Sequence, residues 1–441
     1  MKDDSRNLYE ELASVPMLDV HSHVVGGKLG ARGLHDVLLY HMSVSDLYAA
    51  GCPNGARLTQ FPGWPSNEEA HARILEALPY LPLVRNTHIA WGIRIILREL
   101  YGWKEPVTET NWRKLDDLIR ERADDRAWQR EILKRACIRR ACTEFARRGR
   151  GEDDDILQYS LEWGMVARTQ WGEFDTALYD LERSWGQSPG SPTPIGGKRP
   201  PAERTIRTLD DVHAAVKHYV DHIPYGEIIS SATGISSDID YRVISDDEMR
   251  EALARRGAAG VRERDIYASY ITEALLTALE PHGHEFVYQF SLGAEPLPFE
   301  TGGRLPQRTL AQLGGIIGRH PRLRFQAFLA CTHANQALCT MVRELPNFSL
   351  SGYWWHSFFP AAIRQMMSER LDMLPTNKQM GFFSDAYCLE WTYAKAVLVR
   401  YQMAEVLALK VRQGQYSRSD ALAIARAVVY EAPQELLGMK P

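Results

Sequence analysis

The sequence lacks most of the features that would assign it to a specialised class of protein. Its six cysteines form no Cys-x-x-Cys pair, which argues against a zinc ribbon or a disulfide scaffold and fits a reducing compartment. No apolar run reaches about 18 residues, so we expect no membrane span, and the first residues lack the apolar stretch of a signal peptide. The formal net charge of −4 provides no basic field for nucleic acid. These absences predict a cytoplasmic protein with neither a membrane nor a nucleic acid as partner.

The composition is that of a large globular protein. Of the 441 residues, 45% are hydrophobic and 24% are charged, which is ordinary for a chain with a substantial core. This length accommodates either one large barrel with insertions or two domains. The 11 tryptophans and 19 tyrosines, together with a helix predicted over residues 5–15, are compatible with a homo-oligomer of undetermined size.

The most informative stretch is Met-Leu-Asp-Val-His-Ser-His at residues 17–23. Its first four residues predict a short strand. Because side chains alternate along a strand, His21 and His23 are expected on the same side at its C-terminal end. Two neutral imidazoles form half of a divalent-metal site, which usually adds a carboxylate and an open position. Asp385, at the end of the apolar run 381–385, is the predicted third ligand. Without a metal, the His-x-His pair is only a structural feature of a strand end.

Strands and helices alternate in the second half of the chain. The predicted strands cover 286–292, 324–329, 348–356 and a run ending at 385, with helices at 310–318, 334–345, 361–370 and 391–412. Further helices are predicted over 67–100 and 111–150, and a loop over 187–201. The polar residues at the predicted strand ends are His21, His23, Ser291, His333, His356 and Asp385. A metal site that joins the first and last strands implies a sheet closed on itself, an α/β fold of the (β/α)8 barrel type, with these residues on its catalytic face.

Several motifs, in order and spacing, resemble the uronate isomerases (glucuronate isomerases), an outlying branch of the metal-dependent amidohydrolase superfamily. The matching stretches are Asp-Val-His-Ser-His at 19–23, then 39–51, 91–102 and 289–294, Gly-Tyr-Trp-Trp-His at 352–356, and Gly-Phe-Phe-Ser-Asp at 381–385. The resemblance implies one distorted (β/α)8 TIM barrel of the metal-dependent hydrolase type over residues 1–441, with a mostly helical insertion at 65–215. It also implies one divalent metal, usually zinc, and the interconversion of an aldose uronate such as glucuronate with its 2-keto isomer.

The chain departs from the pattern of this family at three places, which makes it a divergent relative. Family members usually have His where this chain has Ser291, and an Asp-His pair expected near residues 229–234 is replaced by Ser-Ala-Thr. They usually follow the last-strand Asp with Ser-Arg, whereas Asp385 is followed by Ala386 and Tyr387. That arginine would hold a substrate carboxylate through two parallel contacts, which tyrosine cannot reproduce. The metal half of the site is therefore retained better than the sugar-acid half.

The residues expected to contact a small sugar-acid substrate are His41, Arg57, Trp355, His356 and Tyr387. The alternative for His41 and His356 is a structural polar contact beside aromatic rings. For Arg364, a further candidate, a position on a surface helix is the better explanation. Asp385 is the candidate catalytic residue, because a carboxylate there would bind the metal or act as the base.

Three functions are compatible with these residues. The first is a metal-dependent isomerase, in which a proton moves between C1 and C2 of the sugar while the metal acts as a Lewis acid. The second is a hydrolase, lactonase or decarboxylase of the same superfamily on a different carboxylated substrate, with metal-activated water and Asp385 as the base. For this function Ser291 removes one expected ligand, which His333 would restore. The third is a non-catalytic barrel that binds little metal.

Overall fold

The computed structural model describes residues 3–58, 65–149, 151–162, 174–185, 203–296 and 301–439. The loop predicted over 187–201 lies outside these ranges. Within them, no helix is both long enough and apolar enough to cross a membrane.

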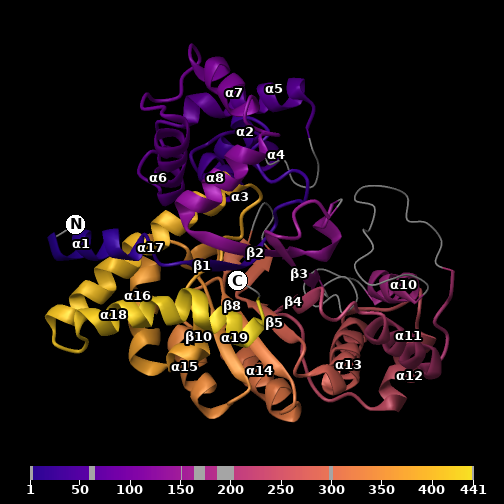
Figure 1. The fold of residues 1–441 in the computed structure, drawn as a ribbon. Coiled ribbons are helices and arrows are strands. Elements are labelled where there is room, and N and C mark those ends of the chain that lie inside the picture. Colours follow the sequence, from indigo (N-terminus) through magenta and orange to yellow (C-terminus); the bar gives the residue numbers. More distant parts are fainter. Residues whose placement is uncertain are drawn as a thin grey trace.

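An eight-stranded sheet forms the centre of the molecule (Figure 1). Its strands are β1 (Met17–Ser22), β2 (Ile138–Glu144), β3 (Leu157–Glu162), β4 (Ile228–Ile235), β5 (Val287–Leu292), β8 (Arg324–Leu329), β9 (Phe348–Ser351) and β10 (Gln379–Met380). They follow one another around the sheet in chain order, and all neighbouring pairs are parallel. A separate antiparallel hairpin of β6 (Ala294–Pro296) and β7 (Thr301–Gly303) follows β5.

The sheet returns to its first strand through the residues that follow β10. The Asp385 amide donates to the His21 carbonyl over 2.9 Å, and the His23 amide donates to the Ala386 carbonyl over 2.8 Å. These two bonds join the last segment to β1, so the strands form the distorted (β/α)8 barrel that the sequence predicts. Only two residues of this last segment are regular strand, which makes the closure irregular on that side.

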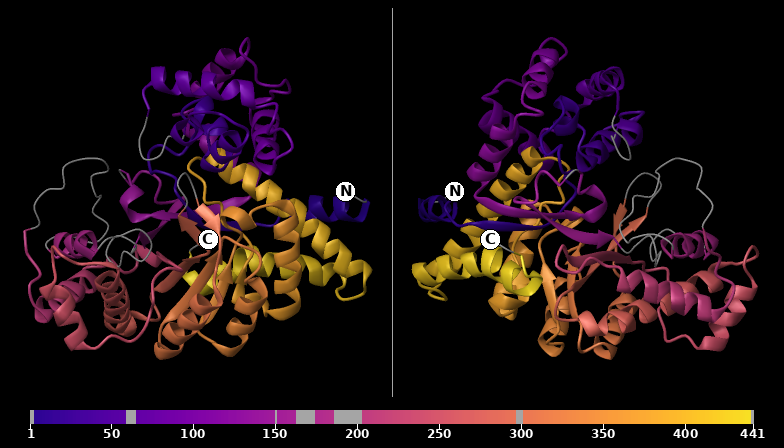
Figure 2. Two further views of the ribbon diagram at one scale, coloured as in Figure 1. Left: turned by 180° about the vertical axis from the view of Figure 1, so that it is seen from behind. Right: turned by 45° about the vertical axis from the view of Figure 1, so that its right-hand side comes forward.

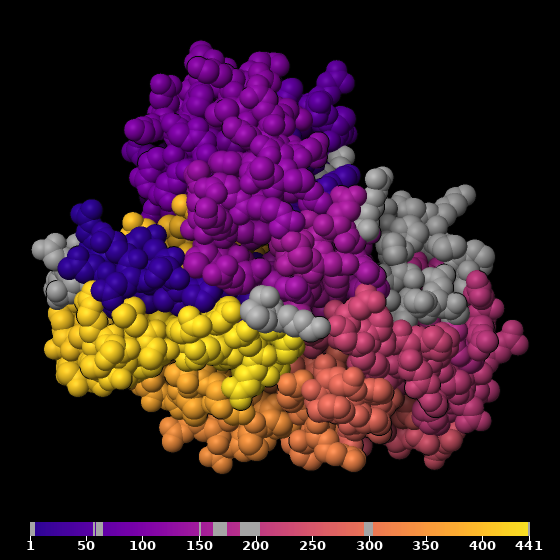
Figure 3. Space-filling model, viewed as in Figure 1, coloured from indigo at the N-terminus to yellow at the C-terminus, as the bar shows by residue number. Residues whose placement is uncertain are grey.

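Helices connect the strands and cover the outside of the barrel. Between β1 and β2 lie α2 (Leu34–Leu38), α3 (His41–Ala49), α4 (Gly55–Leu58), α5 (Asn67–Ala77), α6 (His88–Ile95), α7 (Trp112–Arg120) and α8 (Arg126–Ala136). They form the layer at the top of Figure 1, which stands out from the rest of the molecule in the space-filling view of Figure 3. Between β3 and β4 lie α10 (Phe174–Ser184) and α11 (Leu209–Asp221), and between β4 and β5 lie α12 (Asp246–Ala254), α13 (Val261–Leu279) and the 3-10 turn η4 (Glu280–His282).

The later helices surround the other side of the barrel (Figure 2). They are α14 (Gln307–Arg319), α15 (Asn335–Glu344), the 3-10 turn η5 (Trp355–Ser357), α16 (Pro360–Met373), α17 (Leu389–Arg412), α18 (Arg418–Arg426) and α19 (Ala432–Leu437). The N-terminal helix α1 (Asp3–Leu12) packs against α17. The first helix of the described chain therefore lies against the long helix that follows Asp385.

The helical prediction for residues 111–150 is only partly right. The charged stretch 111–150 is expected to be helical, but α8 ends at Ala136 and residues 138–144 form β2. Arg139 is exposed and Arg140 is half-buried, whereas residues 141–143 are buried, so these charges mark a strand end and not a helix face. The range 65–215 of the expected insertion therefore contains two barrel strands, β2 and β3, and the helical layer runs from α2 to α8.

A cluster of buried apolar side chains joins several strands of the barrel. Leu18, Val20, Cys142, Ile229, Val287, Phe328, Met380 and Phe383 form one cluster with Leu437 and Met439. The rings of Phe328 and Phe383 lie 5.1 and 5.5 Å from the His21 ring, measured between centroids. His21 therefore packs directly on the apolar core of the barrel.

A buried histidine links helices on the outside of the barrel. Nδ1 of His320 lies 3.1 Å from Glu280 Oε1, and its Nε2 lies 3.1 Å from Glu273 Oε2. Arg319 pairs with Glu273, and Arg322 pairs with Glu280. Burial lowers the pKa of His320, but the two carboxylates outweigh burial, so its pKa in the folded protein is raised.

We expect His320→Gln to destabilise the protein more in acid than in base. Because the folded pKa lies above the unfolded value of about 6.5, stabilisation by the charged imidazole is complete below about pH 6.5 and is lost as the pH rises through the folded pKa. The thermal midpoint of the variant should therefore fall further below that of the wild type at about pH 6 than at about pH 9. The exposed His284→Gln is the control, and an equal deficit at both pH values would contradict the ion-pair account.

Candidate metal centre

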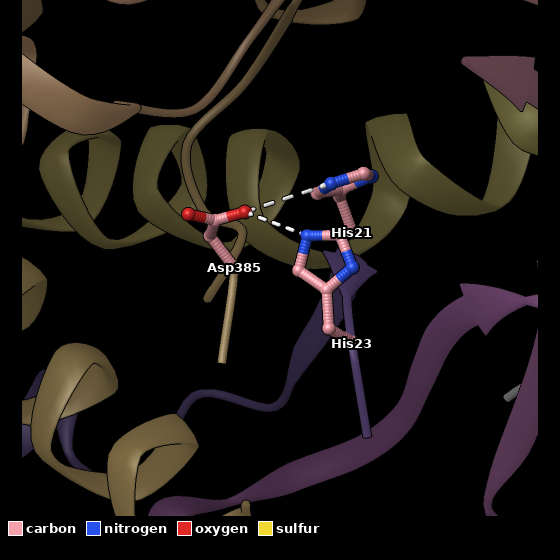
Figure 4. A group of neighbouring side chains, drawn as sticks. All are labelled: His21, His23 and Asp385. Carbon is pink, nitrogen blue, oxygen red and sulfur yellow. Dashed lines mark hydrogen bonds and ion pairs between the residues drawn. The ribbon is translucent and has the colours of Figure 1, made fainter. Parts of the chain in front are cut away.

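Three side chains that are distant in the sequence meet at the C-terminal end of the barrel (Figure 4). His21 lies in β1, His23 follows it, and Asp385 follows β10. Nε2 of His23 lies 3.1 Å from Asp385 Oδ1, and Nε2 of His21 lies 3.7 Å from the same oxygen. One donor atom from each residue lies within 4.8 Å of the other two. A cation about 2.1 Å from each donor would hold its ligands about 3.4 Å apart, so these residues fit one divalent ion.

Glu144, the last residue of β2, orients the imidazole of His23. Its Oε1 lies 2.6 Å from His23 Nδ1, and its Oε2 accepts a hydrogen bond of 2.9 Å from Arg147 Nε. Burial raises the pKa of Glu144, but His23 and Arg147 outweigh burial and lower it to about 2. An ionised carboxylate only accepts hydrogen bonds, which assigns a proton to His23 Nδ1 and directs Nε2 at Asp385.

The charges around the three residues favour a cation between them. Burial disfavours a charged His23, but Glu144 and Asp385 raise its pKa to about 9. The contact of 3.1 Å between His23 Nε2 and Asp385 Oδ1 lies at the place that a cation would take. Burial and the charge of His23 lower the pKa of His21 to about 4, which keeps that imidazole neutral. Burial raises the pKa of Asp385, but the hydrogen bond from His23 outweighs burial, so its pKa lies well below the ordinary value.

The backbone at Asp385 adopts a conformation that is unusual for a residue with a side chain. Its φ is 53°, in the left-handed region, which costs a non-glycine residue about 1–3 kcal/mol and is typical of functional sites. The preceding residue is held by Asp19, whose Oδ1 accepts from the Ser384 amide over 2.7 Å and whose Oδ2 accepts from the Ser384 hydroxyl over 2.5 Å. Burial raises the pKa of Asp19 to about 7. These bonds hold the strained segment beside the first strand.

His41 lies next to the three residues. Its Nε2 is 3.8 Å from Asp385 Oδ2, and neither of its ring nitrogens forms a hydrogen bond within the described part of the chain. Burial lowers the pKa of His41 to about 3, so the ring is neutral. Asp385 therefore directs one carboxylate oxygen at His21 and His23 and the other at His41. The neutral imidazole of His41 thus also faces this site.

Aromatic rings surround these polar groups. Tyr387 stacks on His23 with centroids 4.8 Å apart, and Trp355 lies 4.6 Å from the ring of His41. The strand predicted over 348–356 ends at Ser351, and Trp355 belongs to η5 with a φ of 47°. The aromatic surroundings of the site thus come from the segments that follow β9 and β10.

The contacts of the other predicted residues are with groups other than Asp385 where the structure describes them. The ring of His356 is 6.2 Å from that of Trp355 and 6.5 Å from that of Phe359, measured between centroids. Arg364 pairs with Gln402. Arg57 belongs to α4, and its side chain is outside the part of the molecule that the structure describes.

The residues at the departures from the family pattern make other contacts. The Ser291 hydroxyl donates to the Thr233 carbonyl over 3.0 Å, which satisfies it within the sheet. Nε2 of His333 lies 3.3 Å from the Leu305 carbonyl, and within the described part of the chain His333 does not join the cluster of His21, His23 and Asp385. His333 therefore does not restore the ligand that Ser291 removes.

The sequence alone did not reveal Glu144, Tyr40 or Lys395. The sequence predicts a helix over 111–150 that includes Glu144, which hides the place of this residue at a strand end. Lys395 stands alone in the apolar stretch 391–399, and an isolated charge in such a stretch is a signal that could have indicated a buried functional lysine.

We expect Glu144→Gln to weaken divalent-metal binding by about 10–100-fold, the usual effect of losing a partner that orients a metal-binding imidazole. The amide keeps the size of the side chain but no longer requires a proton on His23 Nδ1. Competition with a chromophoric chelator measures the affinity. Glu273→Gln, which alters the carboxylate–imidazole pair at His320, is the matched control. Unchanged affinity in Glu144→Gln would show that Glu144 does not orient His23.

Comparison with known proteins gives a fold but no sequence relative. No protein-family model and no curated protein matches the chain. Among solved structures, a uronate isomerase from Thermotoga maritima has a TM-score of 0.78 and 14% identity, covering 99% of this chain and 98% of that one. A glucuronate isomerase from Caulobacter crescentus has a TM-score of 0.77 and 16% identity, covering 100% and 96%.

A Lactobacillus casei protein, assigned provisionally as a metal-dependent hydrolase, has a TM-score of 0.58 and 11% identity, covering 98% of this chain and 97% of that one. The similarity to the two isomerases is thus greater and extends over almost every residue. At sequence identities of 11–16%, this similarity establishes the fold alone. The chain has the fold of the uronate isomerases, a (β/α)8 barrel.

Proposed function

We propose that this protein is a metal-dependent sugar-acid isomerase that interconverts an aldose uronate, such as glucuronate, with its 2-keto isomer. The observation that carries the proposal is the cluster of His21, His23 and Asp385 at the closure of the barrel. A divalent metal, for which zinc suits two imidazoles and one carboxylate, supplies Lewis acidity to the substrate oxygens when bound. The residues that hold it would be these three.

Asp385 is the residue that we assign to proton transfer. Its two oxygens face different groups, with Oδ1 toward His21 and His23 and Oδ2 toward His41 at 3.8 Å. The carboxylate is ionised because its pKa lies well below the ordinary value through its hydrogen bond with His23. Oδ2 can therefore take a proton from C2 of an open-chain aldose and return it to C1, while the proton of the C2 hydroxyl passes to the oxygen on C1. Together these two proton transfers convert the aldose to the 2-ketose.

His41, Trp355 and Tyr387 are the residues that we assign to substrate binding. The neutral His41 offers a nitrogen to a sugar hydroxyl beside Asp385, and the two aromatic rings enclose the polar groups and limit access of water. His356 and Arg57 stay predictions for substrate binding. Position 387 is tyrosine and not arginine. This chain would therefore bind the substrate carboxylate in a different way from the uronate isomerases.

The second candidate function is a hydrolase, lactonase or decarboxylase acting on a different carboxylated substrate. The observation that favours it is Tyr387, which stacks on His23 at the position of the expected arginine. In this reaction Asp385 would take a proton from water instead of from carbon. The two candidates share the metal ligands and differ in whether Asp385 faces a sugar carbon or a water molecule.

We expect the zinc-loaded protein to convert glucuronate to its keto isomer and not to hydrolyse lactones or amides. His23→Ala should lower kcat/KM by more than about 100-fold, beyond the loss expected for an outer partner, and the exposed His284→Ala should leave it unchanged. Turnover of lactones or amides without turnover of uronates would support the second candidate. A metal content below about a tenth of an equivalent after reconstitution would instead support the non-catalytic barrel.

A further inference from the structure

Lys395 of α17 is a buried cation that the proposed reaction does not use. It is 2% exposed, and its Nζ lies 4.8 Å from the ring centroid of Tyr40 and 4.7 Å from that of Phe358. Within the described part of the chain, no carboxylate forms an ion pair with it. Lys410 on the same helix is equally buried, but its Nζ lies 2.5 Å from Asp372 Oδ1. Because a buried charge is costly without a paired charge, the position of Lys395 requires an explanation.

The ammonium group of Lys395 is the first member of a chain of hydrogen bonds that ends at the metal site. Its Nζ donates to the Tyr40 hydroxyl over 2.7 Å, and that hydroxyl donates to the backbone carbonyl of Asp385 over 2.9 Å. An ammonium group has only donors and a tyrosine hydroxyl has a single proton, so the direction of both bonds is fixed. Burial lowers the pKa of Lys395 to about 8, opposed by Asp385 and Asp19, which keeps the amine charged at neutral pH.

This chain meets the residue whose backbone is strained. The Asp385 carbonyl accepts from Tyr40, and the Asp385 amide donates to the His21 carbonyl over 2.9 Å. The left-handed φ of 53° is thus held from both sides of the residue. A change at the carbonyl would allow Asp385 to relax toward an ordinary conformation, and its carboxylate would then move away from His21 and His23.

We propose that Lys395 and Tyr40 act as one positioning unit that fixes the Asp385 backbone so that its carboxylate faces His21 and His23. Neither residue needs to touch the substrate for this role. The proposal rests on the metal centre of the proposed function. This role explains why Lys395 is buried. Because its ammonium group donates to the Tyr40 hydroxyl, that hydroxyl must donate to the Asp385 carbonyl. The ammonium group also places a positive charge near the Asp385 carboxylate.

The test is a double-mutant cycle on the full-length protein, read out as zinc affinity by competition with a chromophoric chelator. Tyr40→Phe and Lys395→Met should each weaken zinc binding by about 10–100-fold. The double variant should bind about as weakly as the weaker single variant, because residues that act as a unit are not additive. Lys410→Met and Tyr416→Phe, which remove similar groups away from the site, should bind zinc like the wild type.

A second measurement separates positioning from general destabilisation. In the cobalt-substituted protein, the visible absorption should change in Tyr40→Phe and in Lys395→Met but not in the controls, since it reports the ligand geometry. Tyr40→Phe removes one oxygen atom and keeps the ring, so it tests the proposal even if Lys395→Met does not fold.

Three results would overturn the proposal. Wild-type zinc affinity in Tyr40→Phe would show that the hydroxyl does not position Asp385. Additive losses in the double variant would show that the two residues do not act as one unit. A wild-type protein that takes up no zinc would overturn the metal centre itself, which distinguishes failure of the proposed function from failure of the positioning unit alone.

Discussion

The pairing of β1 with the segment after β10 is the constraint on which the site depends. Two backbone hydrogen bonds, from Asp385 to His21 and from His23 to Ala386, join residues that are more than three-quarters of the chain apart. They place the carboxylate of Asp385 3.1 Å from His23, across a sequence separation of 362 residues. Without this closure the histidine pair would have no third donor. The pairing that closes the barrel is therefore also the pairing that brings His21, His23 and Asp385 together.

Groups that contact the three donor residues or their neighbours fix the orientation and charge of these donors. Glu144 fixes the tautomer of His23 from β2, and Asp19 holds Ser384, next to Asp385, from β1. The apolar rings of Phe328 and Phe383 keep His21 neutral by burial. Each of these groups acts on one of the three donor residues. The protein itself therefore sets the charge and orientation of the donors at the candidate metal centre. Such preorganisation is what separates a metal site from a chance meeting of polar side chains.

The sequence was sufficient for the elements that local pattern determines. The short strand before His21 and the long helix after Asp385 followed from apolar periodicity. The meeting of the two ends of the sheet followed from the expected metal site between the first and last strands and from the family resemblance. The sequence was insufficient for β2, because Arg139 and Arg140 resemble a helix face when their neighbours in space are unknown. The error concealed Glu144, and no local pattern could have indicated that Tyr40 and Lys395 converge on Asp385. Contacts between distant segments are a property of the closed barrel and not of any window of the sequence.

The central claim is that His21, His23 and Asp385 bind one divalent cation together. The most direct measurement is anomalous diffraction from crystals of the protein soaked in zinc. The account predicts one strong peak within about 2.3 Å of both imidazole Nε2 atoms and of an Asp385 oxygen. A crystal with no peak there, or with zinc held only by other residues, would contradict it.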